Sequence, residues 1–179
     1  MDYIPGKPLD KAWDAFTADQ KLSISTRLHD YVSQLRSLKG DYIGGANRGK
    51  AIIGRRAALE GGPFESEQDF NRFILADLVK SAPVLLQHYA EHALQDTHEI
   101  VFTHADIAPR NILVDENAQI TALLDWEDAG WYPEYWEYIK AFSHWKPIPD
   151  WPDYLPTILP PRYEREYIGM SFLALLLRH

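Results

Sequence analysis

Apolar residues recur at helical spacing in five stretches of the chain, with polar residues between them. The first begins near Asp19 and ends near Gly40, and its apolar positions are Leu28, Tyr31, Val32, Leu35 and Leu38. The second opens at Ser66 and Asp69, which have the spacing of a capping box. Residues 83–95, 134–145 and 163–176 repeat the pattern. These stretches predict a mostly helical chain.

The middle of the chain follows a different pattern. The run "EIVFTH", residues 99–104, is short and rich in β-prone residues, and "NILVDENAQITALLDW", residues 111–126, has two apolar runs around a polar turn. Such runs predict a strand followed by a hairpin. A chain of 179 residues with 46% hydrophobic residues suffices for one compact core. We therefore predict an α+β, mostly helical fold in a single domain over residues 1–179.

Composition excludes several classes of function. The net charge is −8 and no long basic cluster occurs, so nucleic acid is not an expected partner. The absence of cysteine excludes disulfides, thiolate metal sites and cysteine nucleophiles. No apolar run is long enough to predict a membrane span. We expect a cytoplasmic protein that acts on a small organic molecule.

Three polar residues stand between the apolar runs with the spacing H-x-D-x-x-x-x-N: His104, Asp106 and Asn111. On a loop between strands, Asp106 is suited to accept a proton, while Asn111 and Asp125 offer oxygens to a hard cation. His104 is suited to orient the loop. The alternative is that each of these side chains caps a turn or bonds to backbone, as single polar loop residues often do.

Aromatic and acidic residues gather directly after this motif. The run "DWEDAGWYPEYWEY", residues 125–138, holds five carboxylates and six aromatics, enough to line a pocket with apolar walls. The candidate substrate-binding residues are Trp126, Glu127, Trp131, Tyr132 and Arg110. Packing in the core explains the aromatics of this run equally well, and the sequence does not decide between the two interpretations.

The segments "THADIAPRNILVD" and "ITALLDWEDAGWYPEYWEY" resemble the catalytic loop and metal-binding segment of the aminoglycoside phosphotransferase and choline kinase-like family, in its fungal form. The resemblance extends from "MDYIPGKPL", residues 1–9, which is similar to the hinge between kinase lobes, to the terminal helix. It implies a kinase-like C-terminal lobe with a small β-hairpin. It also implies that Asp106 is the catalytic base and that Asn111 and Asp125 are magnesium ligands.

The chain departs from this family in the parts that hold ATP. Kinases cover the phosphates with a glycine-rich loop and pair them with a strand lysine, both in an N-terminal lobe, and we expect that lobe to be absent here. The segment "GGANRGK", Gly44 to Lys50, follows a predicted helix and lacks the spacing of a phosphate-binding loop. ATP-dependent transfer is therefore not expected of the isolated chain.

Three functions remain open. The first is an enzyme that uses Asp106, His104 and Asp125 for acid/base chemistry without ATP, of isomerase, cyclase or lyase type, for instance in biosynthesis; it needs no cofactor and no resident metal. The second is a phosphotransferase dependent on magnesium and ATP, completed by a homodimer mate or a partner chain that covers the exposed interlobe face. The third is a binding module or a truncated remnant. The sequence favours the first.

Overall fold

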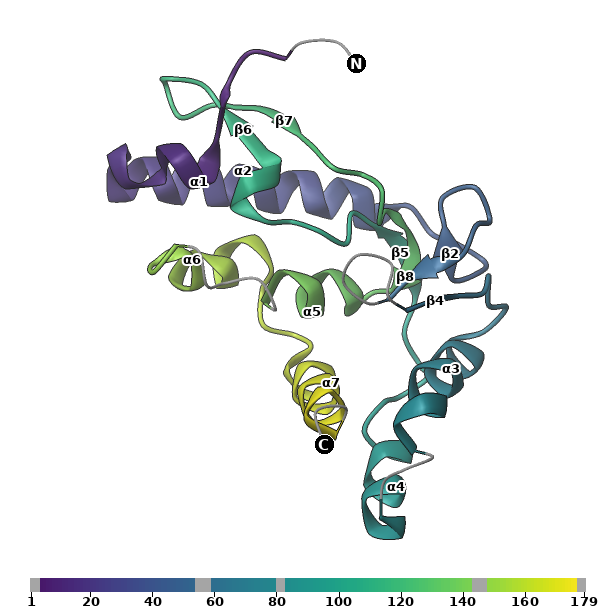
Figure 1. Ribbon diagram of the computed structural model, residues 1–179. Coiled ribbons are helices and arrows are strands. Elements are labelled where there is room, and N and C mark those ends of the chain that lie inside the picture. Colours follow the sequence, from purple (N-terminus) through teal and green to yellow (C-terminus); the bar gives the residue numbers. More distant parts are fainter. Residues whose placement is uncertain (1–3, 54–58, 80–82, 143–147, 177–179) are drawn as a thin grey trace.

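A computed structural model describes residues 4–53, 59–79, 83–142 and 148–176 of the chain (Figure 1). The helices are α1 (Leu9–Ala12), α2 (Ala18–Ser37), α3 (Glu67–Val79), α4 (Val84–Glu91), α5 (Trp136–Phe142), α6 (Trp151–Ile158) and α7 (Glu164–Leu176), with the short 3-10 helices η1 (Trp13–Ala15) and η3 (Pro109–Asn111). The strands are β1 (Lys7–Pro8), β2 (Gly44–Gly45), β3 (Ala51–Ile52), β4 (Glu60–Gly61), β5 (Ile100–Thr103), β6 (Ile112–Val114), β7 (Ile120–Leu123) and β8 (Gly130–Pro133). The predicted α+β, mostly helical class is confirmed.

The long helix α2 confirms the clearest prediction from hydrophobic spacing. It begins with a capping box in which the Thr17 hydroxyl accepts the Gln20 N–H and the Gln20 side chain accepts the Thr17 N–H. The helix buries Ile24, Leu28 and Val32 and packs mainly against α6. In Figure 1, α1, α2 and the β6–β7 hairpin form the upper part, α5 and α6 lie beneath them, and α3, α4 and α7 extend downward.

Three small antiparallel sheets complete the fold. Strands β1, β6 and β7 form one sheet, β2, β8 and β5 form the second, and β3 pairs with β4. The predicted strand over "EIVF" is β5, and the predicted hairpin is β6–β7, with Ile112 opposite Leu123. Each connection between β5, β6 and β7 therefore emerges from a paired strand, which fixes where the candidate loop begins and ends.

Two clusters of buried side chains form the core. One lies between α1, α2 and α6 and is centred on Trp13, Leu28 and Trp151. The other lies between α3, β8 and α5 and includes Phe70 and Trp136. The half-buried rings of Tyr163 and Tyr167 pack against both clusters, so the start of α7 links the two parts of the core.

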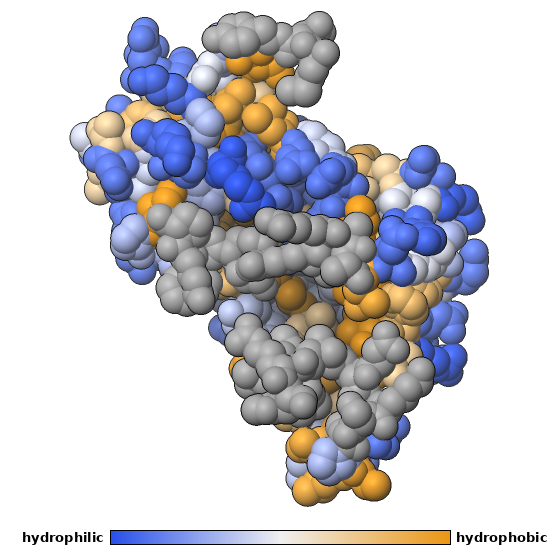
Figure 2. Space-filling view, in the orientation of Figure 1, coloured by the Kyte–Doolittle hydropathy of each residue, from blue (hydrophilic) through white to orange (hydrophobic). Residues whose placement is uncertain are grey.

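Several predicted elements differ from the observed ones. Helix α4 ends at Glu91 rather than near Gln95, and the Leu85 and Tyr89 side chains, expected to pack, are 60% and 51% exposed. Figure 2 shows hydrophobic surface at the lower end of the molecule, where α4 lies. Helix α5 starts at Trp136 because residues 130–133 form a strand; its predicted end near 145 lies outside the described residues.

Strand β8 and helix α6 are the longest of the described elements that were not predicted; the two-residue strands β1 to β4, the one-turn helix α1 and the 3-10 helices were not predicted either. Strand β8 has the sequence "GWYP", and glycine and proline at its ends are more typical of a turn than of a strand. Helix α6 lies within the proline-rich stretch after α5, with Pro152 in its first turn, where proline fits a helix, and Pro156 further along. None of the described helices combines the length and apolarity that crossing a membrane requires.

Candidate active site

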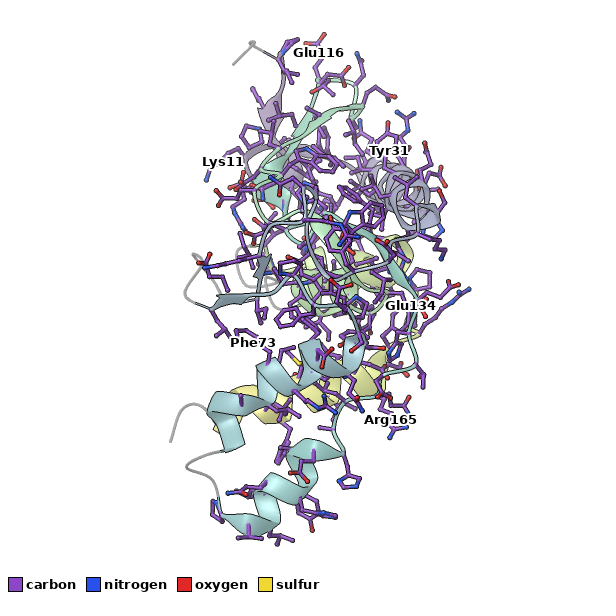
Figure 3. The ribbon with its side chains drawn as sticks, turned by 90° about the vertical axis from the view of Figure 1, so that its right-hand side faces the viewer. Lys11, Tyr31, Phe73, Glu116, Glu134 and Arg165 are labelled. Atoms are coloured by element: carbon purple, nitrogen blue, oxygen red, sulfur yellow. The ribbon has the colours of Figure 1, made fainter. Side chains whose placement is uncertain are left out.

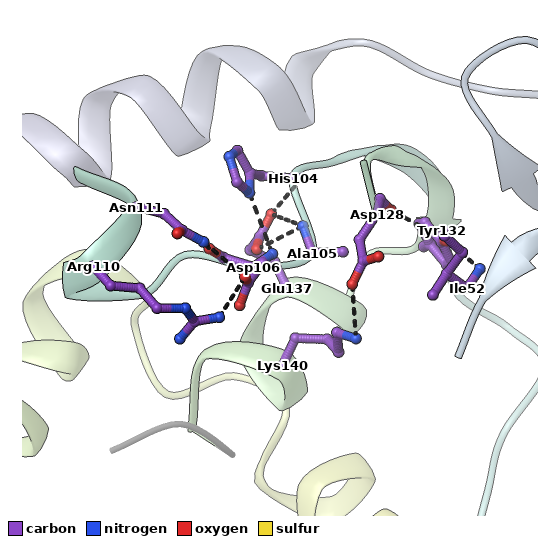
Figure 4. A network of polar contacts seen from close by, with 10 residues as sticks. All are labelled: Ile52, His104, Ala105, Asp106, Arg110, Asn111, Asp128, Tyr132, Glu137 and Lys140. Atoms are coloured by element: carbon purple, nitrogen blue, oxygen red, sulfur yellow. Dashed lines mark hydrogen bonds and ion pairs between the residues drawn. The ribbon is translucent and has the colours of Figure 1, made fainter. Parts of the chain in front are cut away.

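The loop that follows β5 presents Asp106 in a fixed position (Figure 4). Arg110 donates from Nη2 to Oδ2 of Asp106 over 2.5 Å, and Asn111 donates from Nδ2 to the same oxygen over 2.7 Å. A second bond from Nδ2 of Asn111 reaches the Asp106 carbonyl over 3.1 Å. Among the described residues, none donates to Oδ1 of Asp106. One carboxylate oxygen is thus anchored, and the other is left for a ligand.

His104 holds the loop rather than facing a ligand. Its side chain is buried, Nδ1 lies 3.2 Å from the Asp106 N–H, and Nε2 lies 3.1 Å from the Leu124 carbonyl. An N–H can only donate and a carbonyl can only accept, so Nδ1 is the acceptor and Nε2 carries the hydrogen. Burial lowers the pKa of the ring, which favours this neutral form. The sequence prediction that His104 orients the loop agrees with these contacts.

Glu137, in α5, supports the loop from below and was not found from the sequence. Its carboxylate accepts the His104 N–H over 2.7 Å and the Ala105 N–H over 3.1 Å. Burial raises its pKa to about 7, against the opposing effect of the two N–H bonds. Ala105 has a φ of 67°, in the left-handed region that side chains rarely adopt, so the two bonds hold the backbone at a bend.

Asp125 follows β7 and faces solvent. Its φ is 65°. Both neighbouring residues form hydrogen bonds that fix the backbone. The Leu124 N–H donates to the Asn111 carbonyl over 2.7 Å, and Trp126 donates from Nε1 to the Leu123 carbonyl over 2.9 Å. The Trp126 ring also lies 4.4 Å from the His104 ring, centre to centre. These contacts join the segment carrying Asp125 to the loop carrying Asp106 and Asn111.

The oxygens of Asn111 and Asp125 fit a hard cation such as magnesium. The hydrogen bonds of the Asn111 amide use its Nδ2 hydrogens, and no described residue donates to its Oδ1. The Asp125 carboxylate is exposed and makes no bond to a described residue. Carboxylate and amide oxygens are ligands that magnesium accepts, with water and phosphate oxygens completing the shell.

The predicted substrate-binding residues divide into two groups. Arg110, Trp126 and Glu127 are exposed around the loop. Tyr132 is fully buried, and its hydroxyl donates to the Asp128 carbonyl over 3.3 Å and accepts the Ile52 N–H over 3.0 Å. Burial raises the pKa of Tyr132 to about 12. A substrate does not reach this side chain, which corrects the prediction for Tyr132.

The half-buried Trp131 ring is also a packing residue in this structure. It stands edge-on against Phe102 at 5.2 Å and faces Tyr42 at 6.4 Å, centre to centre. The other aromatics of the run, namely Tyr135, Trp136 and Tyr138, are buried as well. The interpretation of Tyr135, Trp136 and Tyr138 as core residues is therefore confirmed, and the exposed part of the run is limited to its first residues, 125–127.

The hinge-like segment lies beside the hairpin that follows the loop. Strand β1 pairs with β6, with Lys7 opposite Val114 and Pro8 opposite Leu113; residues 1–3 of the predicted segment lie outside the described residues. A cavity of about 780 Å³ opens between this segment, α1 and the hairpin turn. The segment Gly44–Lys50 begins with strand β2, which pairs with β8, and forms a tight turn before β3.

Comparison with known proteins identifies the family. Residues 1–169 match the model of the phosphotransferase enzyme family, which confirms the resemblance to aminoglycoside phosphotransferases. No curated protein matches the chain. A solved structure with the same fold is the apoenzyme of macrolide 2'-phosphotransferase from Brachybacterium faecium, with a TM-score of 0.53 and 19% sequence identity. The match covers 97% of this chain and 60% of that one. The chain therefore belongs to the phosphotransferase enzyme family.

Proposed function

We propose that the chain supplies the acceptor-binding and metal-binding half of a phosphotransferase that acts on a hydroxyl group of a small molecule. The observation that carries the proposal is the state of Asp106: one oxygen is anchored by Arg110 and Asn111 and the other is unengaged. A base must lie within hydrogen-bonding reach of the proton it removes. A rigid carboxylate with one free oxygen at the end of a supported loop meets this requirement.

In the proposed mechanism, the acceptor hydroxyl donates a hydrogen bond to Oδ1 of Asp106. This bond orients the hydroxyl oxygen toward the phosphorus of the donor. As the oxygen–phosphorus bond forms and the bond to the leaving oxygen breaks, the proton passes to Asp106. Arg110 keeps the carboxylate in place, and its exposed guanidinium lies where it can meet a developing negative charge.

Asn111 and Asp125 would hold magnesium in this proposal. When bound, the ion neutralises charge on the phosphates. Two protein oxygens form a sparse shell, so we expect the ion to arrive with the nucleotide rather than to reside in the protein. The remaining groups that hold ATP would come from protein outside the described residues, either a homodimer mate, a partner chain or further polypeptide.

A second candidate is acid/base chemistry without ATP on a small organic substrate, as the sequence suggested. It is favoured by two carboxylates on adjacent connections, Asp106 and Asp125, which could act as a pair. His104 contributes less than the sequence suggested, because both of its ring nitrogens bond to backbone. We therefore place this candidate second.

Nucleotide binding separates the two candidates. The purified protein, together with the part that supplies the remaining ATP-holding groups, is heated with and without magnesium and ATP. A specific ligand at a hundredfold excess over its Kd stabilises by about 2.7 kcal/mol. Phosphotransfer predicts a shift that depends on magnesium, disappears in Asp125→Asn and persists in Asp30→Asn, a variant of an exposed residue of α2. Absence of any shift, together with Asp106-dependent turnover of a substrate without nucleotide, would favour the second candidate.

A further inference from the structure

The last turn of α4 carries three side chains that can bind a metal. His88, Glu91 and His92 stand at positions i, i+3 and i+4, which lie on one face of a helix. One ligand atom from each lies within 4.8 Å of the others, and all three residues are exposed. Among the described residues, no other group of three or more histidine, aspartate or glutamate side chains brings its ligand atoms this close together.

A backbone hydrogen bond prepares one of the histidines for this role. Nδ1 of His92 lies 2.7 Å from the carbonyl oxygen of His88. Because a carbonyl can only accept, Nδ1 carries the hydrogen, and Nε2 is left with a lone pair. Metal-binding histidines usually donate their second ring nitrogen to such an oxygen, which fixes both the tautomer and the ring. The His88 and His92 rings lie 4.4 Å apart, centre to centre.

We propose that His88, Glu91 and His92 form a surface site for a divalent transition metal of the zinc class. Two imidazoles and one carboxylate suit zinc, nickel or copper, whereas magnesium and calcium prefer shells made only of oxygen. Three protein ligands leave room for water in the fourth position of a tetrahedral zinc. The ion fixes the end of α4, where the chain leaves the helix on its way to β5.

The site is separate from the candidate active site. Figure 1 shows α4 at the lower end of the molecule, away from the loop between β5 and β6, and Figure 3 shows it at the same end from a second direction. The ligand types differ as well, because Asn111 and Asp125 offer only oxygens. The proposal therefore stands whether or not the chain transfers phosphate.

The test is a calorimetric titration of the full, untagged chain with zinc chloride. We expect one equivalent to bind with high affinity, and His88→Gln and His92→Gln each to weaken it at least tenfold. Glu91→Gln should weaken it less, because two imidazoles remain. The matched control Asp96→Asn removes a nearby exposed carboxylate outside the group and should leave binding unchanged. Binding should also weaken as the pH falls, because protons compete for the imidazoles.

Two further measurements make the outcome decisive. Magnesium chloride in place of zinc should give no saturable binding, and zinc should shift the imidazole nitrogen resonances of His88 and His92 in the nuclear magnetic resonance spectrum. Circular dichroism confirms that each variant is folded. Undiminished zinc binding by the double variant His88→Gln, His92→Gln, or binding weaker than millimolar in the unaltered chain, would overturn the proposal.

Discussion

His104 and Glu137 meet at the backbone of the candidate catalytic loop, and both are occupied in shaping it. Each His104 ring nitrogen bonds to backbone, and each Glu137 oxygen receives a loop N–H. Asp106 differs because one of its oxygens is unengaged. The hydrogen bonds therefore distinguish His104 and Glu137, which hold the loop, from Asp106, which has one oxygen available to a ligand.

Replacement of Asp106 tests its role as the base. Asp106→Asn keeps the size of the side chain but removes the charge that accepts a proton. Once a substrate is known, we expect turnover to fall by about 10²–10⁴, with an unfolding temperature close to that of the unaltered chain. Asp30→Asn, at an exposed position of α2, is the control and should leave turnover unchanged. Full activity in Asp106→Asn would show that the base lies elsewhere.

Glu137 should make stability depend on pH. Its pKa in the folded chain is about 7, above the value of about 4.3 in an unfolded chain. Between these values the folded state holds the proton more firmly, so the contribution to stability is complete below pH 4.3 and is lost as the pH rises through 7.

The variant Glu137→Gln should reduce this dependence. It should also lower the free energy of unfolding by about 1–3 kcal/mol, because an amide can accept only one of the two loop N–H bonds with its single oxygen. Chemical denaturation at pH 5 and pH 8 measures both effects. An unchanged slope of stability against pH in the variant would contradict the assignment.

The sequence motif drew attention to the candidate ligand-facing residues of the loop but not to the residues that support it. The spacing of His104, Asp106 and Asn111, with the family resemblance, was enough to select Asp106. Glu137 could not be identified from the sequence, because a glutamate near the start of a short helix that also carries Lys140 has the appearance of a solvent-facing residue. Only the fold brings α5 beneath the loop.

At the scale of elements, His98 joins α3 and α7 to the segment that leads into β5. Its N–H donates to Oε2 of Glu67 over 2.9 Å, and Nδ1 lies 2.8 Å from Oε1 of the same residue. On the other side, Nε2 lies 3.5 Å from Oε1 of Glu166 in α7. Burial alone would lower the pKa of His98, but the hydrogen bond to Glu67 and the charges of Glu67 and Glu166 outweigh it and raise the pKa.

This link should be strongest when His98 is protonated. Because the folded pKa is raised, the stability it adds is complete below the unfolded value of about 6.5 and is lost as the pH rises through the folded value. We expect His98→Gln to lower the free energy of unfolding by about 1–3 kcal/mol at pH 6 and by less at pH 8.5. The exposed residue Asp30 of α2 offers the control Asp30→Asn, which should cost little at either pH. An equal cost at both pH values would show that the charge of His98 is not involved.

Hydrophobic spacing predicted the elements whose local pattern and tertiary environment agree. Helix α2 has a capping box and one apolar face, and the β6–β7 hairpin has two apolar runs around a polar turn. Strand β8 could not be predicted in this way, because backbone pairing with β5 on one side and β2 on the other makes it a strand. Helix α6 was hidden by its two prolines, which are tolerated where Trp151 and Leu155 anchor it in the core.

At the scale of the whole molecule, the upper part of the core depends on Trp13. The ring is buried, stands edge-on to Trp151 and Tyr154 at 5.2 Å each, and donates from Nε1 to Asp150 over 2.7 Å. A sequence pattern does not predict this contact, because the partners are more than 130 positions apart. The family resemblance supplied the overall fold that local patterns could not.

Truncation of this ring should destabilise the chain strongly. We expect Trp13→Ala to lower the free energy of unfolding by about 3–5 kcal/mol, the range for large aromatic side chains removed from a core. Trp126→Ala is the comparison: that ring is 43% exposed, so its removal should cost much less. Denaturant titration of both variants measures the difference, and equal costs would contradict this assignment of the core.

The segment from Asp125 to Glu137 serves the site at both ends, and β8 lies between them, paired on both sides. One residue inserted or deleted in β8 would turn each following side chain to the opposite face of the sheet and draw Glu137 away from the loop. The hairpin turn at 115–119 carries no such double constraint. We therefore expect this chain to tolerate a change of length at the hairpin turn better than in the twelve positions from Asp125 to Glu137. Transfer of the site to another protein would require this whole segment at its present length.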